Sequence, residues 1–448
     1  MNKETIIKIF EIYRKNKTMT LSTTGDDLWT SRVYFASKGL YLFAIIEKSK
    51  NYNNIIKNNK VFFTIDRGIP DLFIQGEGEA QILGSPSERE EERILLFQKN
   101  LELIPFVKMV KDLVVIKIKP TKLYLSDFRT SFKPREVIIP KEDDLKFSIQ
   151  LDTPIPKWKR FFKATRPFSF TATFVSCVLG ALLAKELSLP FLFITLLGVL
   201  LIHAGVNALN DLMDYKYKVD DWLVIGASRM LQDKLLTIKE QTALVLILLL
   251  LGSTIGLILT ILKGIWILII GIVGLFLGVF YQVKPIGLKY RALGDLSVFL
   301  AFGPLLAFGS YYVQTQEISI LPIIISFPVG FLVIGILHGN NFRDLVEDIK
   351  AGYKTVASYL GVKGSSYYYL ILVFLSYLFT IILIILKIIP WQTIIVLFTA
   401  PLAYRNVRLA FRPNYLQFGL LDLFTAKLHF SFGILLIVGI ILSRISYG

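Results

Sequence analysis

The sequence predicts a multi-domain protein, in which a small β domain with helices precedes an all-α transmembrane bundle of nine helices. Residues 1–165 carry charged and polar side chains at ordinary density, whereas from Phe168 onward long apolar runs recur. These runs reach the length of about 20 residues that crosses a bilayer core of roughly 30 Å. The hydrophobic fraction of 54% and the mean hydropathy of +0.57 also favour a membrane protein.

The front of the chain shows the period of two that is typical of strands. Short segments between residues 18 and 78 alternate apolar and polar side chains, and turn residues separate them. A helical stretch, Ser87–Val110, interrupts this pattern before a last strand near Leu113–Lys119. We therefore expect a β domain over residues 1–125.

Residues 126–165 are expected to form a linker that ends in a helix at the membrane surface. The segment Lys157–Lys163 mixes cations with aromatic side chains, as helices at the headgroup level do. The membrane domain should then occupy residues 166–448. Its nine expected spans are 168–186, 189–210, 241–262, 264–281, 294–313, 320–338, 367–387, 390–404 and 428–446.

Charge predicts the orientation of these spans. Met1–Asn16 lacks the apolar core of a secretory signal, so we expect the β domain in the cytoplasm. Lys and Arg concentrate in the connections after the even-numbered spans, as the positive-inside rule requires. The C-terminus is then expected outside a plasma membrane. The opposite side carries only Lys185, Lys263, Lys387 and Arg444.

The net charge of +16 fits loops that face anionic lipid better than it fits nucleic-acid binding, because the cations follow the ends of the apolar runs. We therefore expect a lipid bilayer, and no nucleic acid, as a partner. The single cysteine, Cys177, excludes an intrachain disulfide and a thiol-rich metal site.

Two acidic clusters follow the second and sixth spans, where ionisable groups are costly and usually functional. In the first, Asn207, Asp211 and Asp214 are spaced four and three apart, beside Asn210. Such spacings place side chains on one face of a helix. In the second cluster, Asn340, Asp344 and Asp348 are spaced four and four.

Carboxylates on one helical face repel each other unless a cation lies between them. Magnesium prefers oxygen ligands and is typically held by one or two carboxylates together with substrate phosphates. We therefore predict Mg²⁺ between the two clusters, with a diphosphate bound to it. The expected metal ligands are Asn207, Asp211, Asp214, Asp344 and Asp348.

Basic and polar residues near the clusters are candidates for gripping the diphosphate. Lys289 and Arg291, after the fourth span, are expected to act together with the four aspartates in catalysis. The other expected diphosphate contacts are Asn207, Asn210, Arg229, Tyr290, Arg343 and Lys354.

The first cluster resembles the first aspartate-rich motif of the UbiA superfamily of intramembrane prenyltransferases. Asn210, Asp211, Asp214 and Asp220 match its form in the MenA-like branch, whereas the common form would place the third aspartate at Lys218. Members of that superfamily are similar in having nine transmembrane helices. The resemblance covers residues 160–448.

Three further segments carry the same resemblance. Asn341–Thr355 matches the second motif closely, and Gly226–Thr237 is similar to the MenA-like branch. Tyr290–Asp295 is similar too, although the family more often has Glu at the last position. The resemblance implies transfer of a polyprenyl group from its diphosphate to 1,4-dihydroxy-2-naphthoate in menaquinone biosynthesis.

The front domain resembles the split barrel of pyridoxamine phosphate oxidase-like flavoproteins. Ser49 and Lys50 lie where that family often has a pair that contacts the cofactor phosphate. The resemblance implies FMN or a deazaflavin as a cofactor. A barrel without cofactor, kept for docking or dimerisation, is the alternative.

Other functions remain open from the sequence. The acceptor could be geranylgeranylglyceryl phosphate or 4-hydroxybenzoate, because superfamily relatives use these compounds. A membrane transporter would place acidic groups near the midplane, whereas these clusters lie at span ends on one side. A flavin reductase that the helices anchor in the membrane is a third class.

Overall fold

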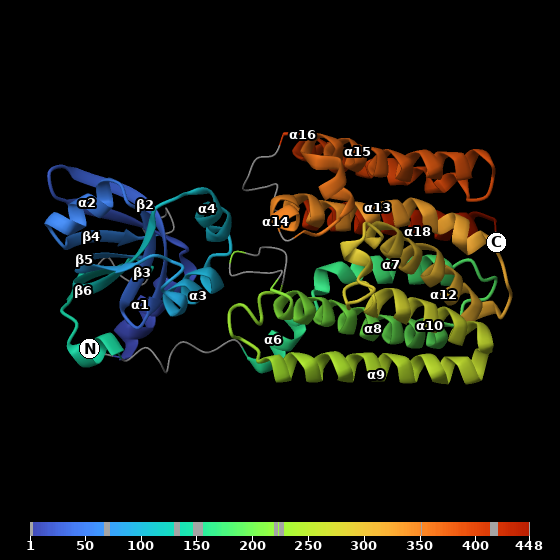
Figure 1. Ribbon diagram of the computed structural model, residues 1–448, viewed down its shortest axis with the longest axis horizontal. Coiled ribbons are helices and arrows are strands. Elements are labelled where there is room, and N and C mark those ends of the chain that lie inside the picture. The colour runs from blue at the N-terminus through green and yellow to red at the C-terminus, as the bar shows by residue number, and fades with distance from the viewer. Residues whose placement is uncertain are drawn as a thin grey trace. The chain divides into compact units, whose positions relative to one another are not determined.

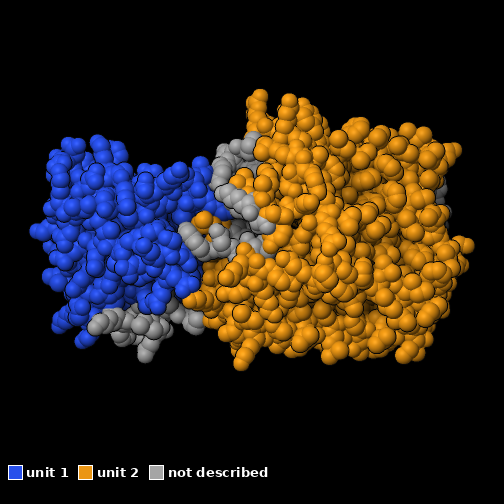
Figure 2. All heavy atoms as spheres, viewed as in Figure 1, with its two compact units in different colours: residues 1–156 blue, residues 157–448 orange. Residues whose placement is uncertain are grey.

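The computed structural model describes residues 3–66, 72–129, 135–146, 156–218, 223, 228–350, 352–412 and 420–447. The chain divides into two compact units, Met1–Pro156 and Lys157–Gly448 (Figure 2). The first unit extends beyond the expected boundary at residue 125. Strand β6 (Leu113–Asp127) passes through that boundary, and β7 (Glu136–Ile138) pairs with β6.

The first unit is a closed antiparallel barrel, which confirms the predicted β domain. Its strands follow the order β3-β2-β1-β4-β5-β6-β7, and an additional pairing of β3 with β6 closes the barrel. The alternation read from the sequence corresponds to side chains that point alternately inward and outward. The remaining strands are β1 (Thr18–Thr24), β2 (Leu28–Lys38), β3 (Tyr41–Glu47), β4 (Lys60–Ile65) and β5 (Leu72–Gly84).

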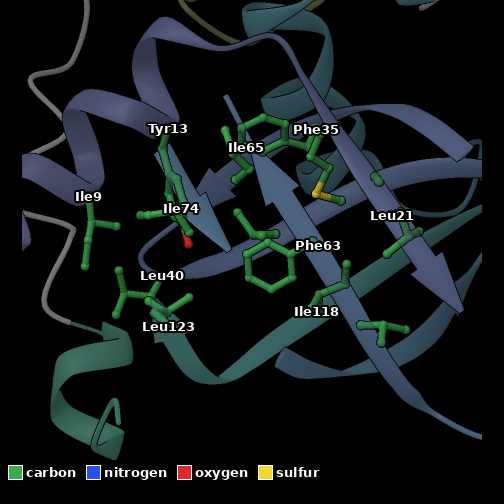
Figure 3. Packing of buried hydrophobic residues seen from close by; sticks show 14 of the residues in the cluster. Ile9, Tyr13, Leu21, Phe35, Leu40, Phe63, Ile65, Ile74, Ile118 and Leu123 are labelled. Carbon is green, nitrogen blue, oxygen red and sulfur yellow. The ribbon is translucent and has the colours of Figure 1, made fainter. Parts of the chain in front are cut away.

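The barrel has its own hydrophobic core, in which Leu21, Phe63 and Ile118 meet from different strands (Figure 3). Helix α1 (Lys3–Lys15) contributes Ile9 and Tyr13 to the same cluster. The expected helical stretch over 87–110 forms two helices. The other helices of this unit are α2 (Lys50–Lys57), α3 (Glu90–Lys99), α4 (Leu103–Met109) and α5 (Glu142–Lys146).

The second unit is a helical bundle whose long helices run alongside one another (Figure 1). Its first half contains α6 (Lys157–Ala164), α7 (Phe170–Ala181), α8 (Leu189–Lys216), α9 (Ile238–Lys263), α10 (Ile265–Val279), the short helix η3 (Leu288–Tyr290), α11 (Gly294–Leu300), the π-helical turn η4 (Ala301–Leu305) and α12 (Leu306–Thr315). Its second half contains α13 (Leu321–Arg343), α14 (Leu345–Lys350), α15 (Val356–Ile385), η5 (Trp391–Thr399), α16 (Ala400–Phe411) and α18 (Leu421–Tyr447).

In the described part of the chain, 7 helical segments are long and apolar enough to cross a membrane. Two shorter apolar helices, Pro167–Ala181 and Ile265–Val279, coincide with the first and fourth predicted spans. The chain is therefore a multi-pass membrane protein. The count of nine spans stays a prediction.

The boundaries of the later spans differ from those predicted. Helix α15 begins at Val356 and is interrupted at Gly361, whose φ of 63° lies in the left-handed region that favours glycine. The apolar run expected from residue 367 is the part beyond this interruption. The last helix begins at Leu421 instead of residue 428, so it includes Asp422. A span predicted from hydropathy alone leaves out charged residues at the end of a helix.

Helix α13 lies at the centre of the bundle. Of its most apolar stretch, 61% of the residues are buried, compared with 17% for α9, which presents most of its surface outward. Close helix contacts rest on small residues, as at Gly180 of α7, where an added Cβ would lie 2.1 Å from the carbonyl oxygen of Ala307. Asn340 lies in the last turn of α13, Asp344 follows its end, and Asp348 lies on α14, so the second acidic cluster is spread over two helices instead of the single helix expected.

Candidate active site

Helix α8 carries the first acidic cluster on its inner face. The side chains of Asp211 and Asp214 are buried, each residue being 2% exposed. Asn207 and Asn210 line a cavity of about 250 Å³, here called the central cavity. Buried carboxylates are costly unless they are paired with cations or hydrogen-bond donors. The partners of these two aspartates therefore define the site.

Asp211 is paired with Arg166, which precedes the first apolar helix. The Arg166 guanidinium donates a hydrogen bond to Asp211 Oδ1, and the backbone N–H of Ser228 lies 3.2 Å from Asp211 Oδ2. Arg166 also lines the central cavity. The sequence prediction missed this residue, because an arginine at the start of a span is usually an interfacial charge.

Asp214 is held by the loop that follows α10. Lys289 Nζ lies 2.8 Å from Asp214 Oδ2, and the Tyr290 hydroxyl lies 2.9 Å from Asp214 Oδ1. Burial and the negative charge of Asp214 raise the pKa of Tyr290, so its hydroxyl stays protonated and can donate. The structure thus brings Lys289 and Tyr290 to the first acidic cluster, where the prediction needs them.

The second acidic cluster is organised around Arg343. The Arg343 guanidinium contacts both oxygens of Asp344, with Nε–Oδ1 2.9 Å and Nη2–Oδ2 2.7 Å, and it lies 3.0 Å from Asp422 Oδ2. It also donates to Asn340 Oδ1. Arg343 therefore holds two carboxylates together, a different environment from the diphosphate contact expected for it.

Asp422 is a site residue that the sequence prediction missed. It lines the central cavity together with Asn340, although it belongs to the last helix. The nearest signal in the sequence was a lone acidic residue just before an apolar run. Only the fold shows that it meets Arg343, which lies 79 residues earlier.

The loop after α10 also contacts the second cluster. The backbone N–H of Ala292 donates to the Lys354 carbonyl at 2.6 Å, and the rings of Tyr290 and Tyr353 lie 4.4 Å apart. Tyr353 in turn donates its N–H to the carbonyl of Asp348 at 2.8 Å. The same loop therefore connects Asp214 with the segment that carries Asp348.

The central cavity is lined by neighbours of the two clusters. Tyr281 and Lys289 both line it, and Lys289 is paired with Asp214. Asn207, Asn210 and Asn340 line it as well, whereas Asp211, Asp214, Asp344 and Asp348 are not among its lining residues.

Three predicted basic contacts lie elsewhere. The Arg229 guanidinium is buried against Asp233, with Nη2–Oδ1 2.7 Å. The Arg291 side chain is exposed and donates to the Pro285 carbonyl at 2.8 Å. Lys354 is exposed as well. None of these three is among the residues that line the central cavity.

A second cavity of about 310 Å³ adjoins the first, here called the apolar cavity. It is lined by α8, α9, α10, α12 and the π-helical turn, and its lining side chains are mostly aliphatic or glycine. The residues that line both cavities are Val199, Ile202, Gly274, Ala301 and Leu306. The central cavity, which has charged lining residues, therefore adjoins the apolar cavity.

The donor set fits magnesium. Among the described residues no three His, Cys, Asp or Glu side chains form a ready-made metal cage. Magnesium usually needs only one or two carboxylates, with water and phosphate oxygens as its other ligands. Asn210 Oδ1 is buried and has no hydrogen-bond partner in the described residues, which leaves an oxygen beside Asp211 for a cation. Asp220, the expected third aspartate, lies outside the described residues.

Ser49 and Lys50 give no support to the predicted flavin site. Ser49 precedes helix α2 without a side-chain capping bond, and Lys50 Nζ lies 3.9 Å from Asp27 and 4.6 Å from the Trp29 ring centre. Two cavities of the first unit, of about 240 Å³ and about 550 Å³, are lined by other residues.

The fold and the site define a class of protein: a membrane-embedded enzyme for an amphiphile with a charged head and an apolar tail. Residues 173–417 match the model of the UbiA prenyltransferase family. The chain belongs to this family and is an intramembrane prenyltransferase.

Two curated relatives are similar to more than half of this chain. UbiA prenyltransferase domain-containing protein 1 of Dictyostelium discoideum is 34% identical over 51% of this chain and 72% of its own length. The 1,4-dihydroxy-2-naphthoate octaprenyltransferase of Bacillus subtilis is 29% identical over 63% of this chain and 92% of its own.

Solved structures match each unit separately. A digeranylgeranylglyceryl phosphate synthase aligns over 64% of this chain and 100% of its own, with 20% identity and a TM-score of 0.46. A Listeria innocua structure named for pyridoxamine 5'-phosphate oxidase aligns over 27% of this chain and 97% of its own, with 22% identity and a TM-score of 0.22.

Proposed function

We propose that this protein transfers a polyprenyl group from its diphosphate to an aromatic acceptor similar to 1,4-dihydroxy-2-naphthoate, in menaquinone or related quinone biosynthesis. One observation carries the proposal: the central cavity is lined by Arg166, Lys289 and Asp422, and it shares lining residues with the apolar cavity. A diphosphate would lie beside these charged side chains and the isoprenoid chain in the apolar cavity. The name of the Bacillus subtilis relative supports the choice of acceptor.

Magnesium would be held by Asp211 and Asp214 on one side and by Asp344 and Asp348 on the other, and Asn207 and Asn210 would supply amide oxygens. When bound, it would neutralise the charge that builds up on the departing diphosphate. Without a cation, Asp211, Asp214 and Asp344 are paired with Arg166, Lys289 and Arg343, respectively.

Arg166 and Lys289 would bind diphosphate oxygens, because both line the central cavity and both already lie beside an aspartate. Tyr290 would donate a further hydrogen bond. The bond between C1 of the prenyl group and the diphosphate oxygen breaks, and its electron pair leaves with the diphosphate. A ring carbon of the acceptor supplies the pair for the new carbon–carbon bond. This carbon then loses a proton, or carbon dioxide from a carboxylate, and the electron pair of the broken bond restores the aromatic ring.

The walls of the central cavity would protect the allylic cation from water. Phe168, Phe302 and Leu337 line it together with its polar side chains. Excluding water strengthens electrostatic stabilisation and prevents hydrolysis of a reactive cation. No side chain has to act as a nucleophile.

We place the protein in the plasma membrane, with the acidic clusters on the cytoplasmic side. The support is the concentration of Lys and Arg in the connections that leave the bundle at this end.

The test is to incubate the membrane-inserted protein with radiolabelled geranylgeranyl diphosphate, magnesium and a panel of acceptors, and to identify the products by mass. The panel contains 1,4-dihydroxy-2-naphthoate, 4-hydroxybenzoate and geranylgeranylglyceryl phosphate. We expect prenylation of the naphthoate. Asp211→Ala and Asp344→Ala should abolish transfer while the protein still inserts. Transfer that persists in either variant would refute the two-cluster model, and transfer to another acceptor would replace the naphthoate.

A further inference from the structure

A buried histidine lies beside the first acidic cluster without belonging to it. His203 precedes Asn207 by one helical turn on α8, is 7% exposed and lines the central cavity. Its ring packs against Phe302 and Phe170, with centroids 4.6 Å and 5.5 Å away. An imidazole in such apolar surroundings needs partners for both nitrogens.

Both nitrogens have a hydroxyl partner. Nδ1 lies 2.8 Å from Thr173 Oγ1, and Nε2 lies 3.2 Å from Ser169 Oγ. Ser169 has two more contacts: its hydroxyl donates to the Arg166 carbonyl at 2.9 Å, and it accepts from Asn207 Nδ2 at 2.9 Å. The histidine is therefore connected to two residues of the site through one serine.

Counting protons fixes the direction of each bond. The Arg166 carbonyl can only accept, so it takes the one hydroxyl proton of Ser169. Ser169 Oγ must then accept from His203 Nε2, which carries a proton. In a neutral imidazole, Nδ1 then has no proton and accepts from Thr173. The network therefore places the proton of the neutral ring on Nε2.

The same count fixes the orientation of the Asn207 amide. Its Nδ2 donates to the Thr165 carbonyl at 2.9 Å as well as to Ser169. Turning the amide over would place Oδ1 against the Thr165 carbonyl and would leave Ser169 one proton short. With both amide hydrogens used on the far side, Oδ1 is the atom that remains for a cation in the central cavity.

We propose that His203 is a positioning residue, which acts through Ser169 to hold Asn207 with its carbonyl oxygen toward the metal and to fix the backbone that carries Arg166. This inference rests on the proposed function. Partners of this kind, behind the ligands themselves, typically contribute 10–100-fold to metal affinity.

The experiment measures Mn²⁺ binding by electron paramagnetic resonance on the full-length protein in lipid nanodiscs, with a non-reacting prenyl thiolodiphosphate present. His203→Phe keeps a flat ring and removes both hydrogen bonds. We expect about tenfold weaker Mn²⁺ binding, with the KM for the acceptor unchanged. His203→Gln, which can donate to Ser169 again, should recover most of the affinity.

His429→Phe is the matched control. His429 is equally buried in α18, does not line the central cavity, and neither ring nitrogen has a hydrogen-bond partner in the described residues. We expect wild-type Mn²⁺ binding in this variant. If His203→Phe fails to fold, Thr173→Val preserves the side-chain shape and removes the donor to Nδ1, and it should weaken Mn²⁺ binding severalfold.

Mn²⁺ binding by a folded His203→Phe or Thr173→Val protein that equals the wild type would overturn the inference and leave the proposed function intact. A loss confined to acceptor KM would overturn it too. No Mn²⁺ binding by the wild type in the presence of the diphosphate analogue would instead remove the proposed function itself.

Discussion

At the residue scale, Lys289 and Arg291 make a matched pair of cations in one loop, and their environments differ. Lys289 lies against Asp214 and lines the central cavity, whereas Arg291 is exposed and contacts a backbone carbonyl. We expect Lys289→Met to lower kcat/KM about 100-fold, the effect of removing one stabilising group from a site of this kind. Arg291→Met should stay within about threefold, because surface contacts contribute little.

Steady-state kinetics with both variants at saturating magnesium checks this difference. Equal losses would show that the loop rearranges when the diphosphate binds, contrary to the contacts described above. The prediction separates two residues that the sequence alone makes equivalent.

Asp422 supports a second residue-scale prediction. It shares Arg343 with Asp344. In the ion pair between Arg343 and Asp422, the Arg343 side chain is 5% exposed and the Asp422 side chain is 10% exposed. Removing one partner of a buried pair costs roughly 3–5 kcal/mol, and the remaining pair with Asp344 reduces that cost here. Asp422→Asn should lower the melting temperature and raise severalfold the magnesium concentration that gives half-maximal activity.

Asp233→Asn controls for the loss of a buried ion pair as such. Asp233 pairs with Arg229 in a comparably buried setting, outside the central cavity. This variant should lower the melting temperature without changing the magnesium requirement. A similar shift in both variants would make Asp422 a stability residue only.

At the element scale, the wall between the two cavities depends on helix α10. Gly274 lines both cavities, and an added Cβ would have no neighbouring heavy atom within 4 Å. Gly256 of α9 is equally open but lines the apolar cavity alone. Leucine at either position improves helix propensity by about 1 kcal/mol, so the fold should survive.

Under the proposed function the prenyl tail extends from the central cavity into the apolar cavity. Gly274→Leu should therefore obstruct every prenyl tail, because Gly274 lines both cavities, whereas Gly256→Leu should exclude only the longer tails. Competition among donors of increasing isoprenoid length, with products separated by mass, measures the cutoff for each variant. An unchanged length profile in both would show that the tail runs elsewhere.

Helix α18 shows how one element completes a site that others begin. Its first turn carries Asp422, and its backbone packs closely on Gly339 of α13, where an added Cβ would lie 3.1 Å from the Asp422 amide nitrogen. The absence of a side chain at Gly339 lets the two helices approach. This contact brings Asp422 within reach of Arg343.

At the scale of the whole molecule, the expected orientation can be measured with single cysteines. Cys177 is fully buried, so Cys177→Ala gives a background without reactive thiols. Lys284 and Lys387 are both exposed, in connections that the predicted topology places on opposite sides. A membrane-impermeant maleimide should label Lys387→Cys in intact cells and Lys284→Cys only after lysis. The reverse pattern would put the acidic clusters outside.

The two compact units have separate cores. The barrel closes through hydrogen bonds between its own strands, and the membrane unit carries the family match. Prenyl transfer is therefore assigned to the second unit. In the barrel, Lys50 contacts Asp27 and Trp29, and these contacts do not support the flavin phosphate site expected there.

Local periodicity allowed much of this protein to be predicted. A period of two gave the barrel strands, and apolar runs gave the bundle, because the backbone geometry of strands and helices fixes both repeats. The helical face shared by Asp211 and Asp214 depends on the same local geometry. The pairing of Arg229 with Asp233 does not follow from the same rule, because a spacing of four brings side chains together on a helix and these residues form turns.

The sequence by itself determined the two-unit organisation, the helical face of the first acidic cluster and the membrane character, since each follows from neighbours a few residues apart. Only the tertiary structure decided that Arg166 compensates Asp211, that Arg343 joins Asp344 to Asp422, and that His203 orients Asn207 through Ser169. These contacts join separate helices. The separation of two residues along the sequence does not predict such a contact, because the contact depends on how closely their segments pack in the fold.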